Sequence, residues 1–316
     1  MNVLNEDDII SFFHIESCLK DDVAKKYVKD FNLNIYTNID SYVFSTDKPV
    51  LMPYRSTIYK AVLASLSDIY IKGLYPLSVG ISIGLKIVRR YILREFKFGL
   101  DRVFKKYGVN GCYKWDTNYT KDPFISVFTV SLGSKELPLW SKASPGMYVY
   151  VDGYFGLTRL GLDFLMGIKN PLDFIDIYDE AINEFLYPSP NLNLYPSIVN
   201  DLGVIASIDS SDGLARSLNT ISSMSNVKIV VDNIPAHKKL LNLFDDQDDI
   251  KRLIKYVFYG GEEYRGIFIC DKIDERSLKK YGLVRIGRIY EGSGVYVKYN
   301  GKFIRIEPTG YIHTFD

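Results

Sequence analysis

The sequence predicts a mixed α/β protein built from two layered units. In the first half, segments with apolar residues at every second position alternate with segments whose apolar residues recur at helical spacing. The second half repeats this alternation and ends in a hairpin, because Asn300-Gly301 separates two apolar strands. The pattern breaks around residues 137–145, where Pro138 and Pro145 fall close together. We therefore expect two domains, 1–137 and 138–316.

Composition and charge narrow the class of protein. The chain has 316 residues, of which 47% are hydrophobic, and this is enough for a sizeable core. Lys plus Arg (39) nearly balances Asp plus Glu (38), so we expect neither nucleic acid nor a membrane as a partner. The three cysteines form no Cys-x-x-Cys pair, and Glu6, Asp7 and Asp8 stand where a secretory signal would be basic. A cytoplasmic location is expected.

Acidic residues follow several elements predicted for the first half. A strand at 42–44 ends in Ser45-Thr46-Asp47, and a short strand at 111–115 is expected to end at Asp116. A helix is predicted over 56–72, with Asp68 in its last turns. A negative charge is unfavourable at that end of the helix dipole, which suggests a role for Asp68 beyond surface solvation.

The remaining elements of the first half are regular. The strand predicted at 78–85 has only Ser and Gly on one face, either to let a second chain approach closely or to pack a helix. An amphipathic helix is predicted over 86–107 and a long strand over 124–132. In the second half we expect strands at 147–151, 204–208, 227–231 and 267–270 and a helix at 158–165, with two polar helices ending at Phe258.

The segment 208–214, Ile-Asp-Ser-Ser-Asp-Gly-Leu, connects a predicted strand to a predicted helix. Ser210 and Ser211 are suitable helix caps, and a helix N-terminus attracts anions. Two carboxylates at such a turn, Asp209 and Asp212, suggest a metal that accompanies a phosphate. The alternative for this segment alone is a capped helix with a solvated acid.

Taken together, six aspartates at turns or element ends indicate a hard cation such as Mg²⁺, because the sequence has no matching His or Cys cluster. Such a set suits phosphoryl transfer, in which the protein positions groups and neutralises charge. The sequence has no Walker A motif and no protein-kinase signature, so a different scaffold is required. These aspartates are Asp22, Asp47, Asp68, Asp116, Asp209 and Asp212.

An ordered set of short motifs, read almost end to end, resembles thiamine-monophosphate kinase, of the superfamily that includes aminoimidazole ribonucleotide synthetase. Ser-Asp-Gly-Leu followed by Gly-Gly-Glu-x-Tyr favours this family over its relatives. The motifs are Asp21-Asp22-Val23-Ala24, Ser45-Thr46-Asp47, Tyr59-Lys60-Ala61, Leu66-Ser67-Asp68-Ile69, Gly73-Leu74-Tyr75-Pro76, Asp116-Thr117, Pro145-Gly146, Tyr150-Val151-Asp152-Gly153, Tyr187-Pro188-Ser189-Pro190, Asp209-Ser210-Ser211-Asp212-Gly213-Leu214, Gly260-Gly261-Glu262-Glu263-Tyr264 and Gly310-Tyr311-Ile312-His313.

The resemblance implies a two-domain fold in which an N-terminal mixed sheet, with helices on one face, pairs into a barrel in a homodimer. It implies ATP-dependent phosphorylation of thiamine monophosphate to thiamine diphosphate by direct transfer, with several Mg²⁺ ions and no catalytic residue beyond those that position metal and substrate. The implied metal ligands are Asp22, Ser45, Thr46, Asp47, Asp68, Asp116, Asp209 and Asp212. The implied ATP contacts are Asp116, Thr117, Ser211 and Lys114, and the implied substrate contacts are Glu262, Tyr311 and Tyr54.

The sequence departs from the family where the nucleotide is handled. Lys114 and Trp115 replace two glycines before Asp116, and Trp140 replaces an arginine that contacts ATP. Two alternatives to an active kinase therefore stay open. One is a non-catalytic relative that binds Mg²⁺ and a phosphate ligand, and the other is a sister ATP-dependent enzyme of the superfamily.

Overall fold

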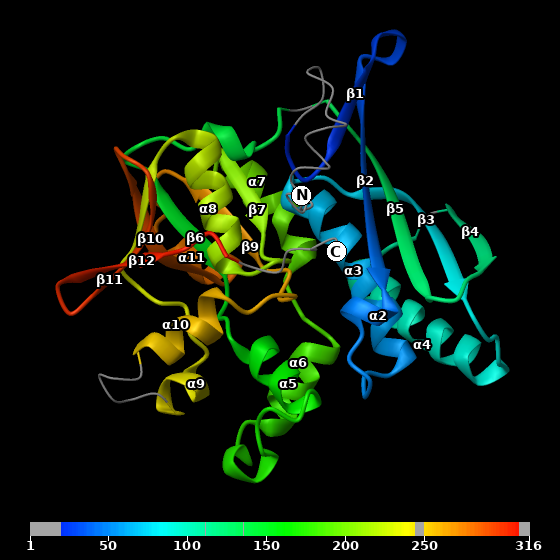
Figure 1. Ribbon diagram of the computed structural model, residues 1–316. Helices are drawn as coiled ribbons and strands as arrows, with labels where there is room; N and C mark the ends of the chain where they lie inside the picture. Colours follow the sequence, from blue (N-terminus) through cyan, green and yellow to red (C-terminus); the bar gives the residue numbers. More distant parts are fainter. Residues whose placement is uncertain (1–19, 111, 135, 244–249, 310–316) are drawn as a thin grey trace, which may run out of the picture.

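A computed structural model of the chain describes residues 20–110, 112–134, 136–243 and 250–309. Figure 1 shows two sheets on either side of a central helix, α3 (Tyr54–Ile71). The mixed α/β class predicted from the sequence is confirmed. None of the helices in these described ranges is both long and apolar enough to cross a membrane.

The first sheet has five strands in the order β1-β2-β5-β3-β4. It is mixed, because β3 and β4 run parallel while the other neighbours are antiparallel. Besides α3, the helices of this half are the short α2 (Phe44–Asp47) and α4 (Arg90–Tyr107). The strands are β1 (Ala24–Val28), β2 (Leu33–Val43), β3 (Pro76–Leu85), β4 (Cys112–Tyr119) and β5 (Phe124–Gly133).

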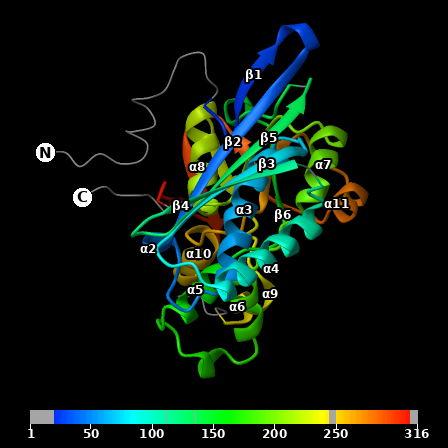
Figure 2. The ribbon, with the colours of Figure 1, turned by 90° about the vertical axis from the view of Figure 1, so that its right-hand side faces the viewer.

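Helices α3 and α4 cover one face of the first sheet (Figure 2). Val79, Ile81 and Ile83 of β3 point into this core, so the Ser and Gly residues between them face away from both helices. The interpretation that the small residues pack a helix is therefore wrong. The same outer face exposes Ile39 and Phe128, which are 67% and 42% accessible.

The second sheet has seven strands in the order β12-β11-β8-β10-β6-β9-β7. The hairpin predicted at Asn300-Gly301 is present, and both residues have the positive φ that a tight hairpin turn requires. The strands are β6 (Tyr148–Asp152), β7 (Ala206–Asp209), β8 (Lys228–Val231), β9 (Gly266–Cys270), β10 (Leu283–Tyr290), β11 (Gly294–Tyr299) and β12 (Lys302–Ile306), and the helices are α5 (Leu157–Leu165), α6 (Tyr178–Leu186), α7 (Tyr195–Asp201), α8 (Leu214–Ser225), α9 (Lys238–Leu243), α10 (Ile250–Phe258) and α11 (Glu275–Tyr281).

Helix α3 joins the two halves through a shared core. Its apolar side chains pack against the first sheet and also against residues of the second half, including Tyr150 and Phe268. Because α3 is apolar on opposite faces, it is buried along most of its length. The helix thereby fixes Asp68, near its C-terminal end, between the two sheets.

Two local predictions were wrong. Asp116 does not end a strand: β4 runs to Tyr119, because its register with β3 continues past Asp116. Ser210 and Ser211 do not cap α8, whose N-cap is Gly213 without a side-chain hydrogen bond. Instead, the Ser210 hydroxyl accepts a hydrogen bond from the Arg265 backbone N–H at 3.0 Å, which ties this turn to the segment after Gly260-Gly261.

Candidate active site

Three carboxylates from distant parts of the chain meet beside the end of α3. Asp22 precedes β1, Asp68 lies in the last turns of α3, and Asp209 is the last residue of β7. One oxygen atom from each lies within 4.8 Å of the others. The structure thus brings together three of the predicted metal ligands, all with oxygen donors.

Burial raises the pKa of each of these acids. For Asp22 the pKa rises to about 7, although the charge of Lys72 opposes the shift. Burial raises the pKa of Asp68 well above its usual range, and the charges of Asp40 and Asp209 add to the shift. The pKa of Asp209 is also raised by burial, against hydrogen bonds from Ser67 and Ser211. Crowded carboxylates of this kind, one buried and two half-buried, fit a hard divalent cation such as Mg²⁺.

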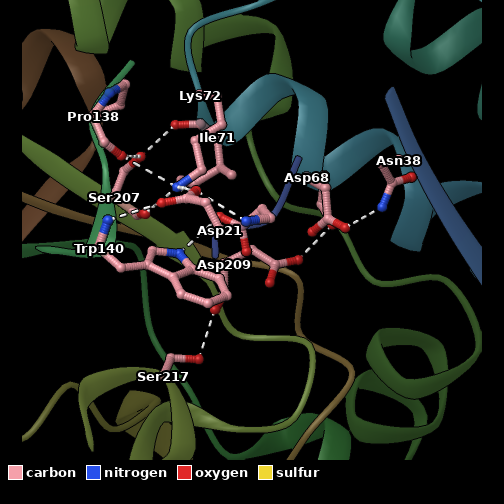
Figure 3. Close-up of polar contacts among 12 residues, drawn as sticks. Asp21, Asn38, Asp68, Ile71, Lys72, Pro138, Trp140, Ser207, Asp209 and Ser217 are labelled. Atoms are coloured by element: carbon pink, nitrogen blue, oxygen red, sulfur yellow. Dashed lines mark hydrogen bonds and ion pairs between the residues drawn. The ribbon is translucent and has the colours of Figure 1, made fainter. Parts of the chain in front are cut away.

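A buried lysine, Lys72, lies next to this cluster (Figure 3). Its ammonium group forms ion pairs with Asp21 and, at 2.8 Å, with Asp22. It also donates hydrogen bonds to the carbonyl oxygens of Ser207 at 2.6 Å and Pro138 at 3.2 Å. Burial lowers the pKa of Lys72, but the two carboxylates outweigh it and the net shift is upward. The sequence reasoning missed Lys72, since nothing local marks a lysine at the end of a helix as buried.

Trp140 contacts Asp21, Asp22 and Lys72. Its backbone N–H donates to Asp21 at 2.9 Å, and its indole Nε1 donates to Asp22 at 3.1 Å. The ring centroid lies 5.6 Å from the Lys72 ammonium nitrogen. Trp140, which stands where the resemblance predicts an arginine, therefore contacts the same Asp21-Asp22 turn as Lys72 does.

A second group that the sequence reasoning missed lies on β2. Asn38 donates from Nδ2 to Asp40 at 3.0 Å and also to Asp68. Its Oδ1 accepts a hydrogen bond from Ser65 at 2.5 Å. Asn38 and Asp40 are two residues apart and so lie on the same face of the strand, which is the signal that sequence reasoning had available.

Asp212 and Ser211 lie on a cleft of about 870 Å³ that is also lined by Asp22, Asp68 and Asp209. Arg216, one turn along α8, lies 3.3 Å from Asp212, and Ser211 donates from its hydroxyl to Asp209 at 3.1 Å. The cleft is large enough for a small-molecule ligand. The three-carboxylate cluster lies at one end of the cleft, and residues of α8 and β11 line much of the rest of it.

Glu262 lies on a strained loop that packs on the Asp212 turn. It has a φ of 61°, unusual for a residue with a side chain, and its N–H donates to the Ser211 carbonyl oxygen at 2.6 Å. Gly213 allows this approach, because a Cβ atom there would lie 2.0 Å from the Gly260 carbonyl oxygen. The two predicted motifs are therefore in direct contact.

The carboxylate of Glu262 reaches a second buried lysine. Lys60, on α3, lies 2.7 Å from it, and the Lys60 ammonium also lies 3.7 Å from the centroid of the Phe185 ring. Burial lowers the pKa of Lys60, while Glu262 and Asp47 oppose the shift. Lys60 thus pairs directly with the predicted substrate residue, and the charge of Asp47 in α2 also acts on it.

The segment Ser45-Thr46-Asp47 forms α2 and makes its own contacts. Asp47 accepts hydrogen bonds from the Val43 N–H at 2.7 Å and from the Thr46 hydroxyl at 2.9 Å. Ser45 donates to Asp122 at 2.5 Å. Among the described residues, these side chains are not part of the three-carboxylate cluster.

Asp116, Thr117 and Lys114 lie on β4, at the edge of the first sheet. Asp116 accepts hydrogen bonds from Ser82 at 2.9 Å and Asn118 at 2.7 Å, which lower its pKa. Ser82 belongs to the face of β3 that points away from the helices, so Asp116 lies on the outer face of the sheet. The structure does not bring Asp116 to Asp68, which lies on the helix side.

Of the other predicted substrate contacts, Tyr54 begins α3 and packs against three aromatic rings, those of Phe44, Tyr91 and Phe96. The Lys48 ammonium lies 5.4 Å from the Tyr54 ring centroid. Tyr311 lies outside the described residues.

Comparison with known proteins finds similar sequences and structures that agree on one family. The chain is 30% identical to the thiamine-monophosphate kinase of Pyrococcus horikoshii, covering 99% of this chain and 97% of the relative. It is 29% identical to that of Nitrosopumilus maritimus, covering 99% of both. A solved structure of AaThiL complexed with AMPPCP and TMP is 25% identical, with a TM-score of 0.83 over 98% of this chain and 97% of that one. No protein-family model matches the chain.

Proposed function

The chain belongs to the thiamine-monophosphate kinase family, and from that membership we propose how its cleft works. The protein phosphorylates thiamine monophosphate with ATP, giving thiamine diphosphate and ADP. AMPPCP, an analogue of ATP, and thiamine monophosphate bind together to the structural relative AaThiL. The single observation that carries the proposal is the carboxylate trio of buried Asp209 with half-buried Asp22 and Asp68, at one end of a cleft of about 870 Å³.

The trio would hold Mg²⁺, with Asp212 adding a further carboxylate from the same cleft. Mg²⁺ bound there would supply charge neutralisation for the phosphates of ATP and for the transferred phosphoryl group. The protein's own residues then position the reactants: Ser211 is placed beside Asp209, and Arg216 directs Asp212 toward the cleft. We propose that Asp47, with Ser45 and Thr46, binds a further Mg²⁺ ion at α2, the short helix that follows β2.

We propose that Glu262 contacts the thiamine moiety. Lys60 supports this role, because its ion pair at 2.7 Å fixes the direction of the carboxylate without occupying the exposed side of Glu262. The strained backbone at Glu262 is held by the Ser211 carbonyl, so the loop that carries Glu262 is tied directly to the turn that carries Asp212. We also propose that Tyr54 and Tyr311 contact thiamine monophosphate.

We propose that the chain is a homodimer formed through the outer face of the first sheet. That face exposes Ile39 and Phe128, which is unusual for an uncovered sheet. It also carries Asp116, with its hydrogen bonds to Ser82 and Asn118. A second copy packed on this face would cover the apolar side chains and would let Asp116 and Lys114, which share this face, contribute to nucleotide binding at the interface. Thr117, on the other face of β4, is proposed as a further ATP contact at the sheet edge.

Three further properties are proposed with the reaction. The division into domains 1–137 and 138–316 falls between the two sheets, since β5 ends at Gly133 and β6 begins at Tyr148. A cytoplasmic location fits the use of ATP and the free, buried thiol of Cys270. Lys114 would contribute charge toward ATP in place of the backbone approach that glycines allow.

An end-point assay tests the proposed function. Purified protein is incubated with ATP, Mg²⁺ and thiamine monophosphate, and thiamine diphosphate and ADP are measured together. We expect the two products in equal amounts, and none with EDTA or in the Asp212→Asn variant. ADP without thiamine diphosphate indicates a sister enzyme. Neither product, with Mg²⁺-dependent binding of thiamine monophosphate retained in calorimetry, indicates the non-catalytic relative.

A further inference from the structure

Lys72 is surrounded as a bound cation would be. Its ammonium group is enclosed by oxygen atoms from four residues: the carboxylates of Asp21 and Asp22 and the carbonyls of Pro138 and Ser207. Two carboxylates and two carbonyls are the donor types that hard cations prefer. The side chain is fully buried, so bulk solvent does not reach the ammonium group.

The oxygens around Lys72 come from three separate parts of the chain. The Asp21-Asp22 turn precedes β1, Pro138 lies in the connection between the sheets, and Ser207 lies on β7. The Ser207 hydroxyl additionally donates to the carbonyl of Ile71 at 2.7 Å, directly before Lys72. The ammonium group at the end of α3 therefore ties the acidic turn to the connection between the sheets and to β7 of the second sheet, as a structural metal ion would.

Lys72 also engages one oxygen of a predicted metal ligand. Oδ2 of Asp22 lies 2.8 Å from the ammonium and accepts the Trp140 indole N–H at 3.1 Å. With that oxygen engaged twice, Asp22 has chiefly its Oδ1 to offer a metal ion. Asp21 has the same two partners but uses both oxygens: Oδ1 pairs with the Lys72 ammonium, and Oδ2 accepts the Trp140 backbone N–H at 2.9 Å.

We propose that the Lys72 ammonium acts as a permanently bound cation of this site. It holds the Asp21-Asp22 turn in its functional conformation when no metal is bound, and it occupies the position of one divalent ion among the carboxylates. Lys72 is a positioning residue, because it acts through Asp22. The inference rests on the proposed function only in that it concerns the same cleft, and its test measures metal binding and local order rather than turnover.

The first test uses the unaltered protein. Hydrogen–deuterium exchange of residues 20–24 is measured in EDTA and in saturating Mg²⁺. Since the ammonium already holds the turn, we expect the exchange rates in the two conditions to agree within about twofold. Slowing by tenfold or more on addition of Mg²⁺ would show that metal, and not Lys72, orders the turn, and would overturn the proposal.

The second test counts ions in Lys72→Met. Equilibrium dialysis with Mn²⁺ is expected to show one more bound ion per chain than in the unaltered protein, and the midpoint of thermal unfolding should rise more on addition of Mn²⁺. Lys142→Met, which removes an exposed ion pair with Glu136 close to Trp140, is the control and should match the unaltered protein. An unchanged ion count in Lys72→Met contradicts the proposal.

Lys72→Met leaves two buried carboxylates without their counter-charge, so a neutral variant that keeps hydrogen bonds is measured beside it. Lys72→Gln retains donors for the carbonyls of Pro138 and Ser207 and should bind the same additional ion. If it folds and binds no additional ion, the proposal fails. Because none of these readouts depends on thiamine diphosphate formation, an inactive protein that passes them refutes the proposed reaction and leaves the inference about Lys72 intact.

Discussion

Ser67 donates a hydrogen bond to Asp209 at 2.5 Å, although 142 positions separate the two residues in the chain. Ser67 directly precedes Asp68 on α3, and Asp209 ends β7. This hydrogen bond therefore links the segments that carry two carboxylates of the cluster, across the contact between the two halves.

Ser67→Ala should loosen that contact. The variant leaves Asp209 buried with one hydrogen bond fewer, so we expect the free energy of unfolding in EDTA to fall by about 1–3 kcal/mol. Urea titration measures this. Ser223→Ala is the matched control. The hydroxyls of both Ser67 and Ser223 lie within hydrogen-bond distance of the carbonyl oxygen three residues earlier, but that contact of Ser223 is exposed. The free energy of unfolding of the control variant should change by less than about 0.5 kcal/mol. Equal effects in both variants would contradict the coupling.

Asp209→Asn should abolish turnover with the fold retained. Replacing a buried carboxylate by an amide removes negative charge from the proposed Mg²⁺ site, and we expect kcat to fall about 100-fold or more. The amide keeps an acceptor for Ser67, so the midpoint of thermal unfolding in EDTA should not fall. The assay of thiamine diphosphate formation, repeated over a range of Mg²⁺ concentrations, measures the effect. Full activity at saturating Mg²⁺ would exclude Asp209 from the site.

The metal-free protein should lose stability as the pH rises. Burial raises the pKa of Asp22 to about 7 from 3.8, so the folded state binds a proton that the unfolded state has released. The stabilisation is complete below the unfolded pKa and is lost as the pH rises through the folded pKa. We expect the free energy of unfolding in EDTA to fall by roughly 1–3 kcal/mol between pH 5 and pH 8.

Urea titrations at several pH values check this dependence. Asp22→Asn should reduce the fall in the free energy of unfolding between pH 5 and pH 8, because the amide does not titrate. Mg²⁺ should also reduce this fall, because it favours the ionised carboxylates. Asp274→Asn is the control: that carboxylate is exposed and its pKa is lowered by hydrogen bonds, so its removal should leave the slope in this range unchanged. A stability that rises from pH 5 to pH 8 would contradict the assignment.

Glu262→Gln should affect thiamine monophosphate more than ATP. The amide keeps the shape of the side chain but loses its charge, so we expect KM for thiamine monophosphate to rise about tenfold while KM for ATP changes less than about twofold. Steady-state kinetics with each substrate varied separates the two. Glu291→Gln, outside the cleft, is the control. An equal rise in both KM values would point to a general disturbance of the loop.

Ile39→Asp should separate the proposed dimer. A charge in the middle of the outer sheet face cannot be buried against a second copy without a large desolvation cost. Sedimentation velocity should show a dimer for the unaltered protein and a monomer for the variant. Ile168→Asp, at a similarly exposed isoleucine in the other half, should stay dimeric. A monomeric unaltered protein would refute the dimer.

The α/β class, most strands and helices, the hairpin at Asn300-Gly301 and the set of aspartates could be predicted from the amino-acid sequence alone, because periodicity, turn residues and charge are local properties of the chain. The sequence did not determine which aspartates meet. Asp22, Asp68 and Asp209 come together because α3 is buried between two sheets, whereas Asp116 lies on the opposite face of the first sheet. The roles of Lys72 and Lys60 were also decided only by the tertiary structure, since burial of a lysine depends on carboxylates and carbonyls contributed by distant segments.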